Sequence, residues 1–450
     1  NADGTFDKTF GVNGVATRAS SGYESDKPVM AIQSDGKILI VKSAIDINNN
    51  HGINKSDFFL LRFNSDGSLD NSFGNSGVVM TDFNMTNEFN ERVVLQPDGK
   101  IIVTGTTFYC SGNCYYDGVI ARYNSNGTLD NSFSEDGKLI IDFGNVIENV
   151  DAVFLQTDGK IMLTGNSGSV YSGGINFILA RINSNGILDN TFDGDGILLS
   201  PLINLNFNIK SVLMQPNGKF IAGGNMIVDG AFDFAICRFN ADGNLDNTFN
   251  GNGIFTIDMS GFDSWYDNEQ LYSIALQGDN KVIAIGFAND ILTNTDFALT
   301  RINTDGSPDN NFSGDGKLYL SYGQSETNFN KIILQPDGKT IAIGRTRSGT
   351  GYSDFIFAIT RYNNNGTPDN SFDEDGKKSI SFYDQQPCIA TEVFVQPDNK
   401  IVIAGTTQTS NYQTEIGIAK LNPDGSFDET FDGDGKLMLS LSSLFPGDAA

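Results

Sequence analysis

The sequence predicts an all-β fold, a seven-bladed β-propeller of four-stranded antiparallel blades. A first observation is a phrase, VLQPDGKIIVTG at residues 94–105, that is one of seven closely similar copies along the 450 residues. A second is that each repeat reads as four short strands, and a third is that no repeat shows a helical period over ten or more residues. The glutamines of the phrase are separated by 63, 60, 59, 62, 58 and 61 residues, and they are Gln33, Gln96, Gln156, Gln215, Gln277, Gln335 and Gln396.

Residues 91–143 serve as the type repeat. The apolar segment ERVVLQ (91–96) is followed by PDG, which is typical of a tight turn, and KIIVTG (100–105) returns as the second strand. DGVIARYN (117–124) predicts a third strand, which ends at the turn SNG. KLIIDF (138–143) predicts the fourth strand.

Twenty-eight strands in one open sheet would leave exposed faces and edges, whereas radial repetition buries the faces of neighbouring blades against each other. Strands that are apolar at successive positions, such as FILARI, fit sheets covered on both faces. We therefore expect one propeller domain over residues 1–450, with the N- and C-terminal segments closing the ring. The fourth strand has an eighth copy, GVATR at residues 14–18, and the sequence does not say which terminus supplies the closing strand.

Each predicted blade has two different ends. The turns between its first and second strands and between its third and fourth strands read QPDGK and NSDGSLDNSF with little change; we call this the constant end. The loops between the second and third strands, and the links between blades, differ from repeat to repeat; we call this the variable end. Because variable loops on a rigid scaffold usually carry function, we expect binding at the variable end.

The unit DFxLARYNSDGxLDxxFGxxG followed by AxxLQPDGKIxxxG resembles the delta-60 repeat of bacterial secreted and cell-surface proteins, also described as a β-propeller repeat. The resemblance covers essentially the whole chain. Departures from the pattern occur at Pro308, Pro368, Lys420, Asn280 and Asn399. The resemblance implies a secreted or cell-surface location, type IX secretion, and a part in surface adhesion or gliding. It implies no catalytic residues.

A basic residue recurs near the end of each third strand, and an acid follows it eight residues later, as in Arg62 with Asp70 and Arg122 with Asp130. A guanidinium next to a carboxylate forms a hydrogen-bonded ion pair, so we expect these residues to stabilise the turn after the third strand. The alternative is a channel lined with cations for an anionic ligand. The basic residues are Arg62, Arg122, Arg181, Arg238, Arg301, Arg361 and Lys420.

Two variable segments predict a binding surface. FDSWYDNE, which contains the single tryptophan, combines Trp265 and Tyr266 with Asp263 and Asp267. The loop TTFYCSGNCYY contributes Tyr115 and Tyr116, and further tyrosines on variable loops are Tyr109, Tyr171, Tyr352 and Tyr412. Aromatic side chains beside carboxylates anchor a protein partner or stack on the sugar rings of an extracellular glycan. The structural alternative is that Trp265 fills a gap between blades four and five.

The four cysteines give one candidate pair. Cys110 and Cys114 enclose only SGN, which predicts a small surface disulfide in an oxidising compartment. A zinc half-site is the alternative, but no second Cys/His pair completes it. Cys237 and Cys388 are expected to be unpaired thiols, the first of them a small buried hydrophobe.

Composition and motifs argue against several functions. With 29 basic and 55 acidic residues the formal net charge is −26, which disfavours nucleic acid and anionic lipid as partners. No apolar run is long enough for membrane insertion. His51 is the one histidine and no GxSxG motif occurs, so we expect no enzyme. A glycan-active hydrolase or lyase using paired carboxylates is the second alternative, after a lectin-like adhesin. We expect no cofactor, with calcium in Asp-rich loops such as FDGDG (192–196) as the alternative to simple turns.

Overall fold

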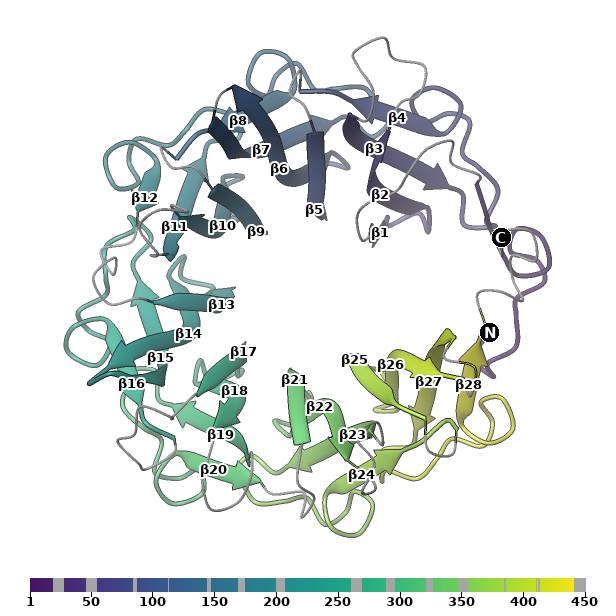
Figure 1. Cartoon of the computed structure of the whole chain (residues 1–450), viewed down its shortest axis with the longest axis vertical. Coiled ribbons are helices and arrows are strands. Elements are labelled where there is room, and N and C mark those ends of the chain that lie inside the picture. Colours follow the sequence, from purple (N-terminus) through teal and green to yellow (C-terminus); the bar gives the residue numbers. More distant parts are fainter. Residues whose placement is uncertain are drawn as a thin grey trace. The chain divides into compact units, whose positions relative to one another are not determined.

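The computed structural model describes residues 1–18, 28–45, 55–83, 87–111, 113–143, 147–168, 175–199, 207–259, 269–288, 296–320, 327–347, 355–383, 386–409, 411 and 413–440. In these ranges the chain forms seven sheets of four antiparallel strands and no helix (Figure 1). The predicted β-propeller fold with seven four-stranded blades is therefore confirmed. No helix that could span a bilayer occurs in this part of the chain.

The first three blades belong to one compact unit, residues 6–207 with 241–244. Blade 1 consists of β1 (Val29–Ile32), β2 (Ile38–Ile45), β3 (Ser56–Phe63) and β4 (Val78–Thr81). Blade 2 consists of β5 (Asn87–Leu95), β6 (Ile101–Ser111), β7 (Asn113–Tyr123) and β8 (Lys138–Ile141). Blade 3 consists of β9 (Ile147–Leu155), β10 (Ile161–Gly168), β11 (Ile175–Ile182) and β12 (Ile197–Leu199).

The other four blades belong to a second unit, residues 1–5, 208–240 and 245–450. Blade 4 consists of β13 (Asn208–Met214), β14 (Phe220–Val228), β15 (Ala231–Phe239) and β16 (Ile254–Ile257), and blade 5 of β17 (Gln270–Leu276), β18 (Val282–Ala288), β19 (Asp296–Ile302) and β20 (Lys317–Leu320). Blade 6 consists of β21 (Thr327–Leu334), β22 (Thr340–Arg347), β23 (Phe355–Tyr362) and β24 (Lys377–Ile380), and blade 7 of β25 (Cys388–Val395), β26 (Ile401–Gln408), β27 (Thr414–Leu421) and β28 (Lys436–Leu439).

Every sheet is built from four consecutive strands, and this corrects one expectation. The eighth fourth-strand copy, residues 14–18, forms no strand, because β28 already occupies the position beside β27 in the last sheet. Near the N-terminus, the backbone carbonyl of Ala2 instead accepts a hydrogen bond from Lys420 (3.0 Å), and that of Asp3 accepts one from Asp432 N (2.7 Å). A single domain over residues 1–450 stays a prediction.

Successive residues of the middle strands face opposite neighbours, which explains their continuous apolar character. Ile101 and Val103 of β6 pack with blade 1, in a cluster that includes Phe58 and Leu60. Ile102, which lies between them in sequence, packs with Ile161 and other residues of blade 3. Apolar runs of this kind are thus required by burial on both faces of the sheet.

The glycine that ends the phrase KIIVTG is required by a β-bulge. The register between β5 and β6 shifts between Asn90 and Arg92, and a Cβ placed on Gly105 would lie 2.0 Å from the carbonyl oxygen of Phe89. A Cβ placed on Gly286 or on Gly405 would likewise lie close to a backbone carbonyl oxygen, at 2.1 and 2.0 Å respectively. Only glycine allows the two backbones to approach so closely.

The QPDGK turn explains two departures from the repeat pattern. Gly99 has a φ of 84°, and its amide donates to the carbonyl oxygen of Gln96 over 2.9 Å. Asn280 and Asn399 occupy the same turn position with a φ of 63° each. Asparagine enters this left-handed region more readily than other side chains, so the turn is kept.

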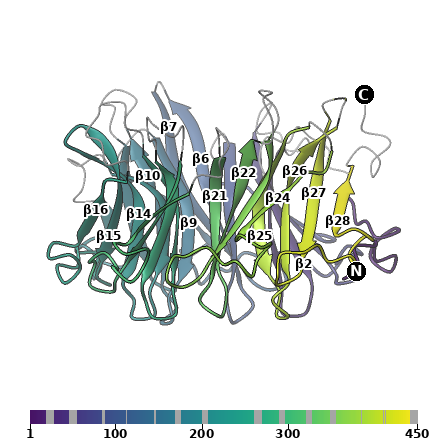
Figure 2. The ribbon, with the colours of Figure 1, turned by 90° about the horizontal axis from the view of Figure 1, so that it is seen from below.

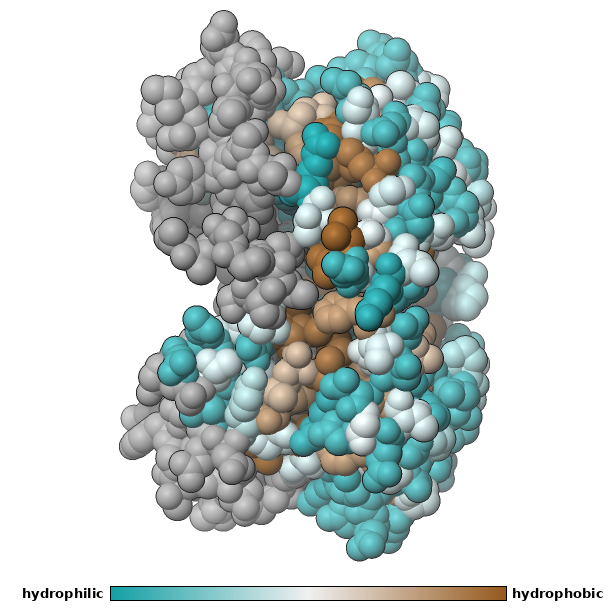
Figure 3. All heavy atoms as spheres, turned by 90° about the vertical axis from the view of Figure 1, so that its right-hand side faces the viewer, coloured by the Kyte–Doolittle hydropathy of each residue, from teal (hydrophilic) through white to brown (hydrophobic). Residues whose placement is uncertain are grey.

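The exposed surface reflects the excess of acidic residues and of polar turns. In the view of Figure 3, hydrophilic residues gather along the right-hand margin, and hydrophobic residues lie nearer the middle. Cys237 and Cys388 are buried and free, as expected from the sequence. The interior of each unit is largely apolar, but it also contains the repeated arginine–aspartate pairs near the strand ends.

Candidate functional site

At the constant end, each repeated arginine contacts several groups of the protein, including its aspartate, an aromatic ring and a backbone carbonyl of the next repeat. Arg122 Nε donates to Asp130 Oδ2 over 2.7 Å, and the guanidinium carbon lies 4.6 Å from the centre of the Phe133 ring. A terminal guanidinium nitrogen donates to the backbone carbonyl of Ser184, in the corresponding turn of the next repeat. Each arginine therefore links the turn of its own blade to the turn of the blade that follows.

The paired aspartate is held by two cations. Besides Arg122, the hairpin lysine Lys100 lies 3.0 Å from Asp130 Oδ2, and the side chain of Asp130 is buried. The same lysine–aspartate–arginine arrangement occurs with Lys37, Asp70 and Arg62. In blade 7, Lys420 replaces the arginine and lies 3.4 Å from Asp428.

These contacts lower the pKa of the aspartates. Burial alone would raise the pKa of Asp70, but hydrogen bonds from Ser72 and the positive charge of Arg62 lower it to about 2. The pKa of Asp130 is lowered as well, because hydrogen bonds from Ser132 and Lys100 outweigh the cost of burial. The aspartates are thus charged at neutral pH and bind their cations strongly.

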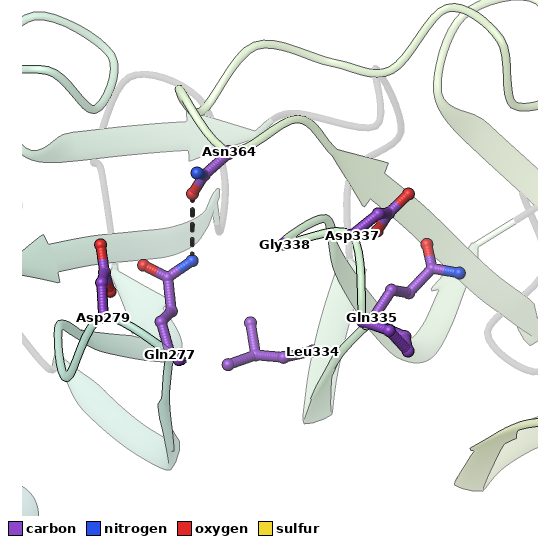
Figure 4. Close-up of a pocket in the computed structure, with 9 residues that line it drawn as sticks. Gln277, Asp279, Leu334, Gln335, Asp337, Gly338 and Asn364 are labelled. Carbon is purple, nitrogen blue, oxygen red and sulfur yellow. Dashed lines mark hydrogen bonds between the residues drawn. The ribbon is translucent and has the colours of Figure 1, made fainter.

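Pockets at the constant end follow from the repeated turns. One, of about 300 Å³, is lined by Gln277, Asp279, Gln335, Asp337 and Asn364, with Gln277 Nε2 donating to Asn364 Oδ1 over 3.2 Å (Figure 4). A second, of about 490 Å³, lies at the equivalent turns of blades 2 and 3. Since the lining residues belong to the repeated phrases, these pockets give no specific recognition site.

The longest structured feature of the variable end is the hairpin of β6 and β7. Each strand has 11 residues, and Figure 2 shows both running up to the upper edge of the view. The segment expected to be a loop, residues 106–116, is therefore largely strand, and that expectation was wrong. The reason lies in its cross-strand pairs, since paired aromatic residues stabilise antiparallel strands.

Two aromatic pairs lie across this hairpin. The rings of Tyr109 and Tyr115 are stacked with centres 5.4 Å apart, and those of Phe108 and Tyr116 are tilted at 4.7 Å. All four side chains are partly exposed. The register sets Cys110 opposite Cys114, and Cys110 is disulfide-bonded. Tyr115 and Tyr116 thus lie on a rigid projection of blade 2.

The second predicted binding segment is the one that contains the single tryptophan. Asp263, Trp265, Tyr266 and Asp267 lie outside the described residues. The same holds for His51 and for Tyr171, Tyr352 and Tyr412. Their proposed roles rest on the sequence alone.

The Asp-rich turns at the constant end have ordinary turn geometry. Asp195 Oδ1 accepts a hydrogen bond from the amide of Ile197 over 2.8 Å, and Asp193 has a φ of 48°. Asp136 makes the equivalent contact with the amide of Lys138 over 2.9 Å. One carboxylate oxygen of each turn is thus used within the turn, as expected for Asx turns.

Three acids that the sequence analysis did not single out converge at the variable end of blades 1 and 2. Asp57 lies in β3, Asp82 follows β4, and Glu88 lies in β5; one carboxylate oxygen of each is within 4.8 Å of the other two. Burial, together with the negative charges of Asp57 and Asp82, raises the pKa of Glu88 to about 8. Among the described residues, this cluster is the candidate for holding a metal ion.

A signal for this cluster was present in the sequence. Asp57 stands five residues before Arg62, and an aspartate stands at the same offset in other repeats, at Asp117, Asp233 and Asp296. An acid also follows the fourth strand at Asp82, Asp142 and Asp258. These acids are hard to recognise in the sequence because they lie at the variable end, where the neighbouring loops differ from repeat to repeat.

Comparison with known proteins identifies the chain by its fold, a β-propeller. Seven segments match the sequence profile of a β-propeller domain of unknown function, at residues 33–73, 96–133, 156–192, 215–249, 277–312, 335–372 and 396–431. No curated protein matches the chain.

Several solved structures are similar in fold. A protein of unknown function from Dyadobacter fermentans is 12% identical with a TM-score of 0.39, over 77% of this chain and 96% of that one. An ulvan lyase from a new family of polysaccharide lyases is 9% identical with a TM-score of 0.49, over 94% and 97%. The β-propeller domain of the Trilobed protease from Pyrococcus furiosus is 9% identical with a TM-score of 0.39, over 89% and 94%. Because the sequence identities and TM-scores are this low, none of the three structures gives information about the function of this chain.

Proposed function

This chain belongs to the DUF5122 family of β-propeller domains of unknown function, and from that premise we propose that it is a non-enzymatic binding module. In this proposal it belongs to a secreted or cell-surface bacterial protein and binds a protein partner through the variable end of its blades. The surface location, and the link to adhesion or gliding and to type IX secretion, come from the resemblance to the delta-60 repeat.

The observation that carries the proposal is the β6–β7 hairpin. It presents two aromatic pairs, Tyr109 with Tyr115 and Phe108 with Tyr116, on strands of 11 residues each, compared with 9 residues in the corresponding strands of blade 4. Stacked aromatic side chains offer a large contact area that loses little conformational entropy on binding, which is why they are enriched at interface centres. A disulfide at Cys110 restricts the hairpin further.

The division of the blade supports the same location. At the constant end the repeated arginines, lysines and aspartates bind one another, so these side chains have a structural task. Among the described residues, the hairpin of β14 and β15 in blade 4 is the nearest counterpart of the blade 2 hairpin, but it places Ile227 opposite Phe232 where blade 2 has the aromatic pair Phe108 and Tyr116. A feature that is not repeated gives one place on the chain a specificity that seven equal turns cannot provide.

A lectin-like adhesin is the alternative, since flat aromatic faces also stack on sugar rings. Tyr109 is hydrogen-bonded to Asp117, so an acid lies next to the aromatic pair. A glycan-active hydrolase or lyase is the second alternative, and it requires that the chain cleave a polysaccharide catalytically.

The test compares the wild-type chain with a Tyr115→Ala/Tyr116→Ala variant as immobilised bait for proteins of the native cell surface. We expect a partner retained by the wild type and lost by the variant. Ile187→Ala is the matched control, because Ile187 is an exposed apolar residue of a constant-end turn. Retention of the same partner by the hairpin variant would contradict the proposal.

The same proteins applied to a glycan array distinguish the alternatives. Binding of a glycan by the wild type and by Ile187→Ala, but not by the hairpin variant, would favour the lectin-like adhesin. Trp265→Ala in both assays tests the second segment. Cleavage of any polysaccharide by the wild type would overturn the non-enzymatic assignment.

A further inference from the structure

The acidic cluster between blades 1 and 2 is built from three separate elements. Asp57 is near the start of β3, Asp82 directly follows β4, and Glu88 is the second residue of β5. Carboxylate oxygens of the three lie within 4.8 Å of one another. Since like charges at this distance repel strongly in a buried site, the arrangement needs either a proton on one of the acids or a bound cation to reduce the charge.

Glu88 supplies an independent indication of a ligand. Its side chain is fully buried, with 0% relative exposure, and no N–H or O–H group of the described residues donates to Oε2. The carboxyl group of Glu88 instead lies within hydrogen-bond reach of another acid, Asp57. The other oxygen, Oε1, lies 3.5 Å from the Thr107 hydroxyl oxygen, whose single hydrogen is shared with the closer backbone carbonyl of Asn87 at 3.2 Å. Two buried acids in contact are costly when both are charged, so either a proton or a bound cation is expected between them.

The geometry fits a hard divalent cation. Calcium binds oxygen ligands at about 2.3–2.6 Å, so two ligands on opposite sides of the ion are about 4.6–5.2 Å apart. Carboxylate oxygens of Asp57, Asp82 and Glu88 all lie within 4.8 Å of one another, so the three are close enough together to bind one such ion. Three carboxylates and no histidine or cysteine argue against zinc and for calcium, which tolerates irregular coordination completed by water.

The same positions are acidic at other blade junctions. Asp117 and Asp142 occupy them between blades 2 and 3, and the charge of Asp142 acts on Asp117. Asp233, Asp258 and Glu269 occupy them between blades 4 and 5, and Glu269 is buried. These sets recur at fixed places in the repeat, which random surface acids would not do.

A lysine accompanies the cluster in both units. Lys138 donates to the backbone carbonyl of Asp82 over 3.1 Å, and Lys317 does the same to the carbonyl of Asp258. Each lysine thus binds a backbone carbonyl next to the acids, and it occupies the same position in both repeats. The side-chain oxygens of the cluster still face one another.

We propose that calcium binds to Asp57, Asp82 and Glu88 and joins blade 1 to blade 2 at the variable end. The ion cancels most of the charge of the three carboxylates and fixes the link between β4 and β5. This link lies in the same unit as the β6–β7 hairpin, and Thr107 of β6 contacts Glu88 directly. Calcium therefore stabilises the base of that hairpin, whatever partner the hairpin binds.

The experiment uses the full chain stripped with chelator and titrated with calcium chloride alone. Isothermal titration gives the number and affinity of bound ions, and thermal unfolding gives the stabilisation. We expect a rise in the melting temperature of roughly 5 °C at saturating calcium. Glu88→Gln, which keeps the size of the side chain, should remove that rise and one bound ion.

The stability of the variant without calcium separates ligand loss from misfolding. Glu88→Gln in chelator should melt no lower than the wild type in chelator, because the neutral amide can donate to Asp57 as the protonated carboxyl group does and adds no buried charge. If that variant does not fold, Asp57→Asn takes its place in the same comparison. Asp195→Asn is the matched control at a constant-end turn and should bind calcium as the wild type does.

Three results would overturn the proposal. One is a melting temperature of the wild type that is the same in calcium and in chelator, with no ion retained on equilibrium dialysis. Another is full calcium binding by Glu88→Gln and its loss in Asp195→Asn, which would move the site to the Asp-rich turns. The third is an equal effect of magnesium at the same concentration, which would contradict the choice of calcium.

Discussion

Arg122 and Asp130 are joined by a 2.7 Å hydrogen bond inside the protein, although eight residues separate them in the chain. Their relative exposures are only 3% and 6%. Through its second contact, with the carbonyl of Ser184, Arg122 connects blade 2 to blade 3. The repeated arginine therefore belongs to the interior of the propeller blades as well as to their turns.

Replacing Arg122 by alanine should destabilise the chain. The change leaves Asp130 buried with Lys100 as its one remaining cation and removes the contact to blade 3. Breaking a buried ion pair costs about 3–5 kcal/mol, and we expect about 3 kcal/mol because Lys100 remains. Urea unfolding measures the change in the free energy of unfolding.

The matched control for Arg122→Ala is an exposed ion pair. Lys331 and Glu392 form one, with side-chain exposures of 40% and 65%, so Lys331→Ala should cost less than about 1 kcal/mol. Equal effects of the two substitutions would contradict a structural role of Arg122. They would favour the alternative in which the arginines serve an anionic ligand.

The lowered pKa of Asp70 predicts loss of stability in acid. A carboxyl group whose pKa falls from about 4 in the unfolded chain to about 2 in the folded chain stabilises fully above pH 4. That contribution disappears as the pH falls through 2. The pKa is also lowered at the six equivalent aspartates, Asp130, Asp189, Asp246, Asp309, Asp369 and Asp428. The free energy of unfolding should therefore fall steeply between pH 4 and pH 2.

Urea unfolding at a series of pH values checks this expectation. Asp70→Asn should be less stable than the wild type at pH 7, and the difference should shrink toward pH 2. Asp195→Asn, at an exposed turn, serves as the control and should follow the wild-type curve. A difference for Asp70→Asn that stays constant over the whole range would show that charge is not the cause.

A methyl group at Gly105 should be poorly tolerated. The new Cβ would lie 2.0 Å from the carbonyl oxygen of Phe89, so β5 and β6 would have to separate at the bulge. We expect Gly105→Ala to cost about 3 kcal/mol, at the upper end of overpacking effects. Gly278→Ala is the control, because nothing lies near that Cβ, and it should be neutral or slightly stabilising. Similar melting temperatures for the two variants would argue against the bulge.

Features that recur in every repeat could be predicted from the sequence, because their physical causes are local. The QPDGK turn, the pairing of Arg62 with Asp70 and the two-sided burial of the middle strands each follow from a few residues. The length of β6 and β7 could not, since Phe108 and Tyr116 pair only once the register of the hairpin is known. The acidic cluster was missed for a similar reason, because Asp57 and Glu88 meet only when two blades pack side by side.

The β6–β7 hairpin should depend on its disulfide locally, with little effect on the whole chain. The loop closed at Cys110 is very short, so its contribution to global stability is small by the chain-entropy argument. We expect Cys110→Ser to speed amide hydrogen exchange in residues 106–116 by about tenfold and to leave the urea midpoint nearly unchanged. The control is Cys237→Ser, which places a hydroxyl in the buried interior of blade 4. That variant should lower the midpoint and leave exchange in the hairpin as it is. Unchanged exchange in Cys110→Ser would mean that the aromatic pairs alone hold the strands together, and the rigidity of the binding surface would then depend on Tyr109 and Tyr115.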